Sequence, residues 1–160
     1  MKLLALAVAL TLTSASLASA QSPTPNNEIG PRVGVSINPD QFVIGGQMNF
    51  PIEPRGLAIS PNIELGVGDN VTTIQFNGDL VYHFSNAGPN WNPYVGGGIG
   101  IAFFDFNNDA GGGSNSEVGI NFIGGMRFRQ KNGSHLFTEL RLGVADIPDA
   151  KVIVGWNFPM

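Results

Sequence analysis

From about residue 30 onward, apolar residues occupy alternate positions over stretches of about one strand length, and no helical period competes with them. Such alternation is typical of β-strands, because successive side chains point to opposite faces. The stretches end in residues that favour turns, such as Asn38-Pro39-Asp40 and Lys131-Asn132-Gly133. The alternating residues run over 33–37, 42–52, 57–67, 74–84, 95–103, 118–128, 136–144 and 152–158. An even number of strands in up-and-down order can close into a barrel that leaves no open edge.

The two faces of these expected strands differ in kind. One face carries Val, Ile, Leu, Phe and Met, and the other carries mainly Gly, Ala, Ser, Asn and Gln. Every charged residue of the strands belongs to the second face. These residues are Arg32, Glu64, Asp79, Arg127, Arg129, Glu139, Arg141 and Lys151.

Volume decides which face lies inside. A soluble barrel of the lipocalin type would direct the apolar face inward, but the interior of an eight-stranded barrel is only wide enough to be filled by side chains. The small residues of the polar face fit that interior, whereas the bulky apolar set does not. An apolar exterior is what lipid requires, and a closed barrel satisfies every backbone polar group. The sequence therefore predicts an all-β fold, a closed eight-stranded antiparallel up-and-down transmembrane β-barrel.

Aromatic residues near the strand ends agree with a membrane location, since membrane barrels carry aromatic girdles at both interfaces. The expected interface aromatics are Tyr82, Phe84, Trp91, Tyr94, Trp156 and Phe158. The expected strand length of about nine to twelve residues also matches a tilted strand that crosses a bilayer.

The first twenty residues differ from the rest of the chain. Lys2 precedes an apolar run over 3–12, and Ala18-Ser19-Ala20 supplies the small residues that a signal peptidase reads. We therefore expect a signal peptide at 1–20, a flexible lead-in at 21–29 and the barrel at 30–160. The apolar run is too short to span a membrane as a helix.

Composition excludes several classes of protein. The absence of cysteine excludes a disulfide scaffold, a thiolate metal site and a lipoprotein anchor. A formal net charge of −4 argues against binding to nucleic acid. Only 12% of the residues are charged, and the alternation explains this scarcity if most of the surface faces lipid.

Three segments carry a resemblance to a known family: 60–66 (SPNIELG), 76–84 (FNGDLVYHF) and 93–100 (PYVGGGIG), to which 137–141 (FTELR) adds. Together, over 30–158, the sequence resembles the small eight-stranded outer-membrane β-barrels of the OmpA/OmpX-like kind, the "outer membrane protein beta-barrel domain". The resemblance implies a bacterial outer-membrane location, contact with outer-membrane lipid and assembly by the outer-membrane insertion machinery. Such barrels usually end on an aromatic residue, whereas this chain ends Phe158-Pro159-Met160.

The charged residues of the polar face predict an ionic network in the lumen, because an isolated charge there would cost several kcal/mol. We expect this network to plug the barrel; the alternative is a narrow channel or small-solute pore lined by the same groups.

A third interpretation is enzymatic. His83-Phe84-Ser85-Asn86 resembles the His-x-Ser-Asn motif of outer-membrane lipid A deacylases, in which His and Ser are catalytic and an acidic residue orients the His. With a periplasmic N-terminus, however, the motif would lie at the periplasmic end, whereas lipid A occupies the opposite leaflet. The expectation is therefore a polar strand end and no enzyme.

Other candidate sites are weak. The segment 105–116 begins like a calcium-binding loop, but Ala110 and Ser116 stand where Gly and Glu are needed. The glycines at 96–100 do not have the spacing of a dinucleotide-binding loop, and His135 has no second His nearby. We expect no catalytic residue, cofactor or metal.

The expected function is a structural or adhesive one for a monomeric barrel. The odd-numbered strands would run outward, so 38–41, 68–72, 105–117 and 145–150 would form outer loops. The turns at 51–56, 85–93 and 130–134 would face the periplasm.

Overall fold

The computed structural model describes residues 26–84, 88–106 and 113–160. The chain forms eight strands in these ranges: β1 (Glu28–Ile37), β2 (Gln41–Ile52), β3 (Leu57–Val67), β4 (Val71–His83), β5 (Trp91–Phe106), β6 (Gly113–Arg129), β7 (His135–Ala145) and β8 (Ala150–Pro159). The described residues contain no helix long and apolar enough to cross a membrane. The predicted signal peptide, and most of the predicted lead-in, lie outside the described residues.

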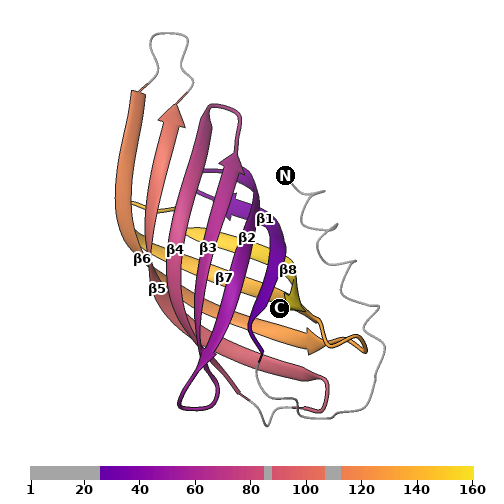
Figure 1. Ribbon diagram of the computed structural model, residues 1–160. Coiled ribbons are helices and arrows are strands. Elements are labelled where there is room, and N and C mark those ends of the chain that lie inside the picture. The colour runs from indigo at the N-terminus through magenta and orange to yellow at the C-terminus, as the bar shows by residue number, and fades with distance from the viewer. Residues whose placement is uncertain (1–25, 85–87, 107–112) are drawn as a thin grey trace.

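The strands close into a barrel in chain order, as Figure 1 shows. Each strand pairs antiparallel with its neighbours, and β1 completes the ring by pairing with β8 from Glu28↔Pro159 to Ile37↔Ala150. The closed eight-stranded antiparallel barrel predicted from the sequence is confirmed. We call the end at which β1 begins, with the turns at 53–56 and 130–134, the proximal end. The distal end carries the turns at 38–40, 68–70 and 146–149.

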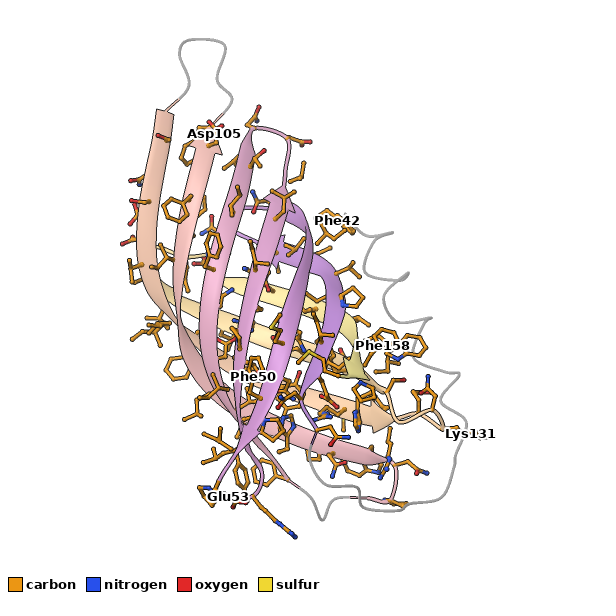
Figure 2. All side chains as sticks on the ribbon, viewed as in Figure 1. Phe42, Phe50, Glu53, Asp105, Lys131 and Phe158 are labelled. Carbon is orange, nitrogen blue, oxygen red and sulfur yellow. The ribbon has the colours of Figure 1, made fainter. Side chains whose placement is uncertain are left out.

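Burial alternates residue by residue along the strands. In β3 the residues from Ala58 to Val67 are in turn buried and exposed: Glu64 is 2% exposed, and its neighbours Ile63 and Leu65 are 47% and 39% exposed. The apolar side chains therefore point out of the barrel and the polar ones point in, as the side chains drawn in Figure 2 illustrate. This is the inside-out arrangement that the volume argument predicts.

Three strands, β4, β5 and β6, extend into segments that were expected to be loops. The segment 105–117 was expected to be a loop, but β5 continues to Phe106 and β6 begins at Gly113, with Asp105 opposite Ser114. Pairing with β7 starts only at Gly119, so residues 113–118 of β6 have a strand neighbour on one side only. The ends of β5 and β6 contain polar residues, which a strand can hold where it does not face an apolar environment. The apolar alternation in the sequence therefore ends before these strands end. Similarly, β4 begins at Val71, inside the expected loop at 68–72.

The lumen also holds apolar side chains. One buried cluster contains Val43, Ala58, Val81, Tyr94, Ile123, Phe137 and Ile153. A second cluster contains Val71, Ala102, Phe104 and Ile147. Ile147 belongs to the turn between β7 and β8, expected to be an outer loop, yet it is only 3% exposed because it packs into the distal mouth.

Candidate functional site

Glu139 lies at the centre of the ionic groups in the lumen. Its Oε1 is 2.8 Å from Arg32 Nη2 and 2.9 Å from Arg141 Nη2. Its Oε2 accepts a hydrogen bond of 2.9 Å from the Tyr94 hydroxyl. One carboxylate on β7 therefore binds side chains from β1, β5 and β7, and it joins opposite walls of the barrel.

The same two arginines each bind a second carboxylate. Arg141 donates to both oxygens of Asp79, from Nη1 at 3.2 Å and from Nη2 at 2.7 Å. This two-pronged geometry suits the planar guanidinium and is the stronger form of such a contact. Arg32 Nε lies 3.1 Å from Glu64 Oε1, and the other oxygen of Glu64 accepts from Lys151, which also donates to Gln75.

We call these six residues the central network: Arg32, Glu64, Asp79, Glu139, Arg141 and Lys151. Three are cationic and three are anionic, so their formal charges cancel. All six are buried, at 1% to 6% exposure. Neutrality matters because an uncompensated charge at this depth would cost several kcal/mol.

Amides extend the central network along the lumen. Asn62 donates to Asp79 Oδ2 at 2.7 Å and accepts from Asn77, whose own Oδ1 accepts from Gln75 and Asn121. A continuous set of polar contacts therefore joins β3, β4 and β6. Few of the buried polar atoms are left without a partner, as the cost of burying an unpaired donor or acceptor requires.

The glycine-rich run on β5 makes room for these side chains. Gly98 lies opposite Asp79 and Gly100 lies opposite Asn77. A Cβ at Gly98 would stand 2.1 Å from Asp79 Oδ1, and a Cβ at Gly100 would stand 2.5 Å from Asn77 Oδ1. The glycines at 96–100, which lack the spacing of a nucleotide-binding loop, therefore have a packing role.

A second group of charges lies at the proximal end, and we call it the proximal cluster: Glu28, His83, Arg127 and His135. Arg127 Nη2 donates to both oxygens of Glu28, at 2.8 and 3.0 Å. His135 Nδ1 is 2.6 Å from Glu28 Oε1, and His83 Nε2 is 3.5 Å from Arg127 Nη1. The His83 ring also lies against Tyr94, with 5.1 Å between the ring centroids.

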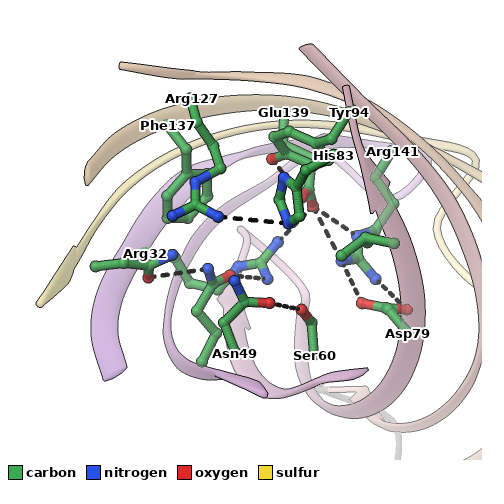
Figure 3. Close-up of a pocket in the computed structure, with 13 residues that line it drawn as sticks. Arg32, Asn49, Ser60, Asp79, His83, Tyr94, Arg127, Phe137, Glu139 and Arg141 are labelled. Carbon is green, nitrogen blue, oxygen red and sulfur yellow. Dashed lines mark hydrogen bonds and ion pairs between the residues drawn. The ribbon is translucent and has the colours of Figure 1, made fainter. Parts of the chain in front are cut away.

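Little empty space remains between the two groups. A cavity of about 20 Å³ is lined by members of both, including Asp79, Arg141, His83 and Arg127, and Figure 3 shows their side chains converging on it. A single water molecule needs a space of about this size. The lumen at this level is therefore filled by side chains.

Seven of the eight residues predicted to form the lumen charge network take part in the ion pairs described above. Arg127 belongs to the proximal cluster, and the other six form the central network. Arg129, the eighth, is half-buried at the proximal end of β6. Sequence reasoning missed Glu28, which had been assigned to the flexible lead-in, although β1 begins at this residue. Extending the alternation backward from Arg32 by two steps would have placed it in the lumen.

Five of the six predicted interface aromatics point outward. Tyr82, Phe84, Trp91, Trp156 and Phe158 are 37% to 44% exposed, and the rings of Trp156 and Phe158 stack with centroids 5.9 Å apart. The prediction is wrong for Tyr94, which is 4% exposed and points into the lumen. The physical reason is strand parity: Val95 faces outward, so its neighbour must face inward.

The remaining candidate sites have a limited structural basis. In the segment that resembles the deacylase motif, His83 contacts Arg127 and Tyr94, whereas Ser85 lies outside the described residues. Half of the calcium-loop-like segment 105–116, residues 107–112, also lies outside them. Across 26–84, 88–106 and 113–160, no group of three or more His, Asp or Glu residues could hold a metal ion.

Comparison with known proteins finds no matching family model and no matching curated sequence. Solved structures do match. The N-terminal β-barrel domain of OprF from Pseudomonas aeruginosa has a TM-score of 0.64 at 19% identity, covering 83% of this chain and 97% of that chain. Neisserial surface protein A also has a TM-score of 0.64, at 10% identity, covering 84% and 95%. The outer-membrane enzyme PagL has a TM-score of 0.54 at 16% identity, covering 83% and 99%.

These likenesses confirm the predicted resemblance at the level of fold. The three proteins are small outer-membrane barrels, and their fold supports a membrane barrel for this chain. At such low identities the likeness concerns the fold alone. Any function must therefore be argued from the barrel's own residues.

Proposed function

We propose that this chain, which has the fold of the small eight-stranded outer-membrane barrels, is itself a non-enzymatic outer-membrane protein. In this proposal the barrel is a lipid-embedded scaffold that displays its distal surface outside the cell, and its lumen is plugged. It would act as a monomer, held in place by outer-membrane lipid after delivery by the insertion machinery.

The apolar exterior supports the membrane part of the proposal. Ile99 and Val118 are 65% and 63% exposed, and the other large apolar side chains of the outer face are exposed in the same way. Soluble monomers rarely expose apolar patches larger than a few hundred Å². A surface of this composition on every strand matches a hydrocarbon solvent.

The main observation in favour of a plugged lumen is the charge-neutral central network. Its six ionic groups pair with one another across the barrel, and about 20 Å³ of cavity remains beside them. A conducting pore would need a continuous path for water and ions. Side chains that fill the lumen and neutralise one another favour a structural role over transport.

An orientation follows as part of the proposal. With the N-terminus in the periplasm, the proximal end faces the periplasm and the distal end faces the exterior. The extended pair β5 and β6 would then project from the outer surface and form the largest displayed element.

Two measurements test the proposal. The purified protein should show heat-modifiable gel migration in detergent, and it should give no conductance steps in planar bilayers. A soluble monomer that needs no detergent would contradict the membrane assignment. The variant Glu139→Ala should lose stability, because two buried guanidinium groups lose their shared partner. If its stability is unchanged while conductance rises, the network is a pore lining and not a plug.

One finding favours a second candidate, a lipid-modifying enzyme: the structural likeness to the outer-membrane enzyme PagL. The candidate residues would be His83 and Ser85. Mass spectrometry of lipid A and phospholipids, incubated with wild type and with Ser85→Ala, decides between them. We expect no released acyl chain in either sample; release by wild type alone would replace the scaffold proposal.

A further inference from the structure

The proximal end contains a pocket that neither the plug nor the membrane surface explains. We call it the vestibule, a space of about 230 Å³ between the end of the β2–β3 hairpin and the ends of β4 and β6. Its walls include Arg55, His83 and Arg127 together with the apolar side chains of Leu57 and Ala58.

The first argument is an available cation at the rim. Arg55 lies in the turn between β2 and β3, and its side chain makes no ion pair with any described residue. The cations of the central network, by contrast, are all paired. A guanidinium group presents several donors in a plane that suits carboxylate and phosphate oxygens.

The second argument is a buried donor without an acceptor. Arg127 can only donate hydrogen bonds, so the ring nitrogen that faces it, His83 Nε2, must be the acceptor. A neutral His83 then carries its proton on Nδ1. That nitrogen is buried and has no hydrogen-bond partner. An unsatisfied buried donor is costly. Because His83 also lines the vestibule, a movement of its ring that exposes Nδ1 would let this donor meet an oxygen acceptor there.

The third argument is the position of the second cation. Arg127 directs Nη2 to Glu28 and Nη1 toward His83, and it also lines the vestibule, so it belongs to both the proximal cluster and the vestibule wall. Glu53 also lines the vestibule, and its carboxylate limits the amount of negative charge that the pocket can accept. The site therefore suits a single small anionic group, with apolar wall beside it for an aliphatic body.

We propose that the vestibule binds an anionic oxygen group, a carboxylate or phosphate, carried by a small molecule or a lipid headgroup with a short apolar portion. Arg55 and Arg127 supply the positive charge, and His83 Nδ1–H donates to one oxygen. Under the proposed orientation this site opens to the periplasm. The site is independent of whether the lumen conducts.

The test uses the full protein, folded in an uncharged detergent and labelled with ¹⁵N at histidine. The probes are inorganic phosphate, hexanoate, dihexanoyl phosphatidate and, as a neutral control, hexanol. Because His83 and His135 are the only histidines in the chain, the ring-nitrogen resonances can be assigned with the variant His83→Gln. We expect saturable shifts of the His83 signals with at least one anionic probe and none with hexanol.

Which anion binds identifies its source. Saturation by phosphate alone indicates a free anion, whereas tighter binding of hexanoate or phosphatidate indicates an acyl or lipid ligand. Equal shifts with hexanol would reduce the vestibule to an apolar pocket and overturn the proposal. An absence of shifts with every probe, in protein that retains heat-modifiable migration, would also overturn it.

A matched pair of variants locates the site. Arg55→Gln should weaken anion binding by about tenfold, the effect of losing one charge-assisted contact. Lys131→Gln removes the same charge from another exposed proximal turn, outside the vestibule, and should change binding by less than about twofold. Equal weakening by both variants would indicate general electrostatic attraction and would contradict a defined site. Gel migration confirms folding of each variant, so failure here leaves the scaffold proposal standing.

Discussion

The central network and the proximal cluster both pair arginine with glutamate, but they differ in how completely their polar groups are paired. In the central network every cation and every carboxylate is paired, and the six charges cancel within a filled section of the barrel. In the proximal cluster Glu28 has several partners, but His83 Nδ1 has none, and the nearby Arg55 carries no ion pair among the described residues. Complete pairing leaves nothing for a ligand, whereas incomplete pairing beside an open pocket leaves both donors and space.

If the vestibule binds an anion as proposed, the two regions separate stability from ligand binding within one short barrel. A closed network contributes rigidity only as a unit, and the removal of one member exposes the others to an unpaired state. The proximal cluster lies nearer to solvent, so a side chain there can lose or gain a partner at a smaller cost in free energy. The following predictions test whether the two regions differ in this way.

The largest effect is expected from Glu139→Gln in the central network. The substitution keeps the shape of the side chain but removes the charge shared by Arg32 and Arg141. The free energy of unfolding should fall by about 3–5 kcal/mol, the usual cost of breaking a buried ion pair. Urea titration of the refolded protein in lipid, followed by Trp fluorescence, measures it. Glu53→Gln in an exposed turn is the control, and an equal loss there would contradict a special role for Glu139.

A smaller loss is expected from Glu28→Gln in the proximal cluster. The carboxylate is buried at 5% exposure, but its partner Arg127 is partly accessible to solvent. The free energy of unfolding should fall by about 1.5–3 kcal/mol, as for a hydrogen bond to a charged group. The same titration measures it. A loss as large as that of Glu139→Gln would remove the distinction between the two regions.

Glycine substitutions should separate the inner and outer faces of the barrel. An alanine Cβ at Gly98 would overlap Asp79 Oδ1, whereas a Cβ at Gly124 meets nothing within 4 Å. Gly98→Ala should therefore cost about 1–3 kcal/mol through overpacking. Gly124→Ala should change stability by less than about 0.5 kcal/mol. Comparison of the two unfolding midpoints checks this, and similar midpoints would mean that the central network tolerates displacement of Asp79.

The smallest effect is expected at the vestibule. Arg55→Gln should leave the free energy of unfolding within about 0.5 kcal/mol of wild type, since the side chain is exposed and has no ion pair among the described residues. Thermal gel-shift assays of this variant and of Lys131→Gln provide the comparison. A marked loss for Arg55→Gln alone would assign Arg55 a structural contact and weaken the case for a free cation.

The sequence was sufficient for the strands, their order and their sidedness, because alternation and turn residues are local signals. It also named the lumen charges, since a charge on the lipid face would be costly. It could not pair them. Arg32 and Glu139 are 107 residues apart and meet only because barrel closure and strand stagger bring β1 and β7 to one level. No local pattern contains that stagger.

Two errors have separate causes. Tyr94 was assigned to the interface from its residue type, although the outward position of Val95 already implied the opposite face. Glu28 was missed because the prolines and asparagines before it resemble a linker. The turn expected at 145–150 is present between β7 and β8, but the turn residues gave no sign that Ile147 packs into the distal mouth.

The strict in-and-out alternation also has a consequence for the proposed delivery of the chain to the outer membrane. A segment halts in the inner membrane when about 20 consecutive residues are predominantly apolar. In this chain the outward Val, Ile and Phe residues are interrupted at nearly every second position by Gly, Ser, Asn or a charged residue, as in 57–67 and 118–129. The folded barrel therefore has an apolar outer surface on every strand. The unfolded polypeptide has no apolar segment in these strands that is long enough to be retained as a transmembrane helix. In the proposed outer-membrane protein, the continuous apolar surface forms only when the barrel closes.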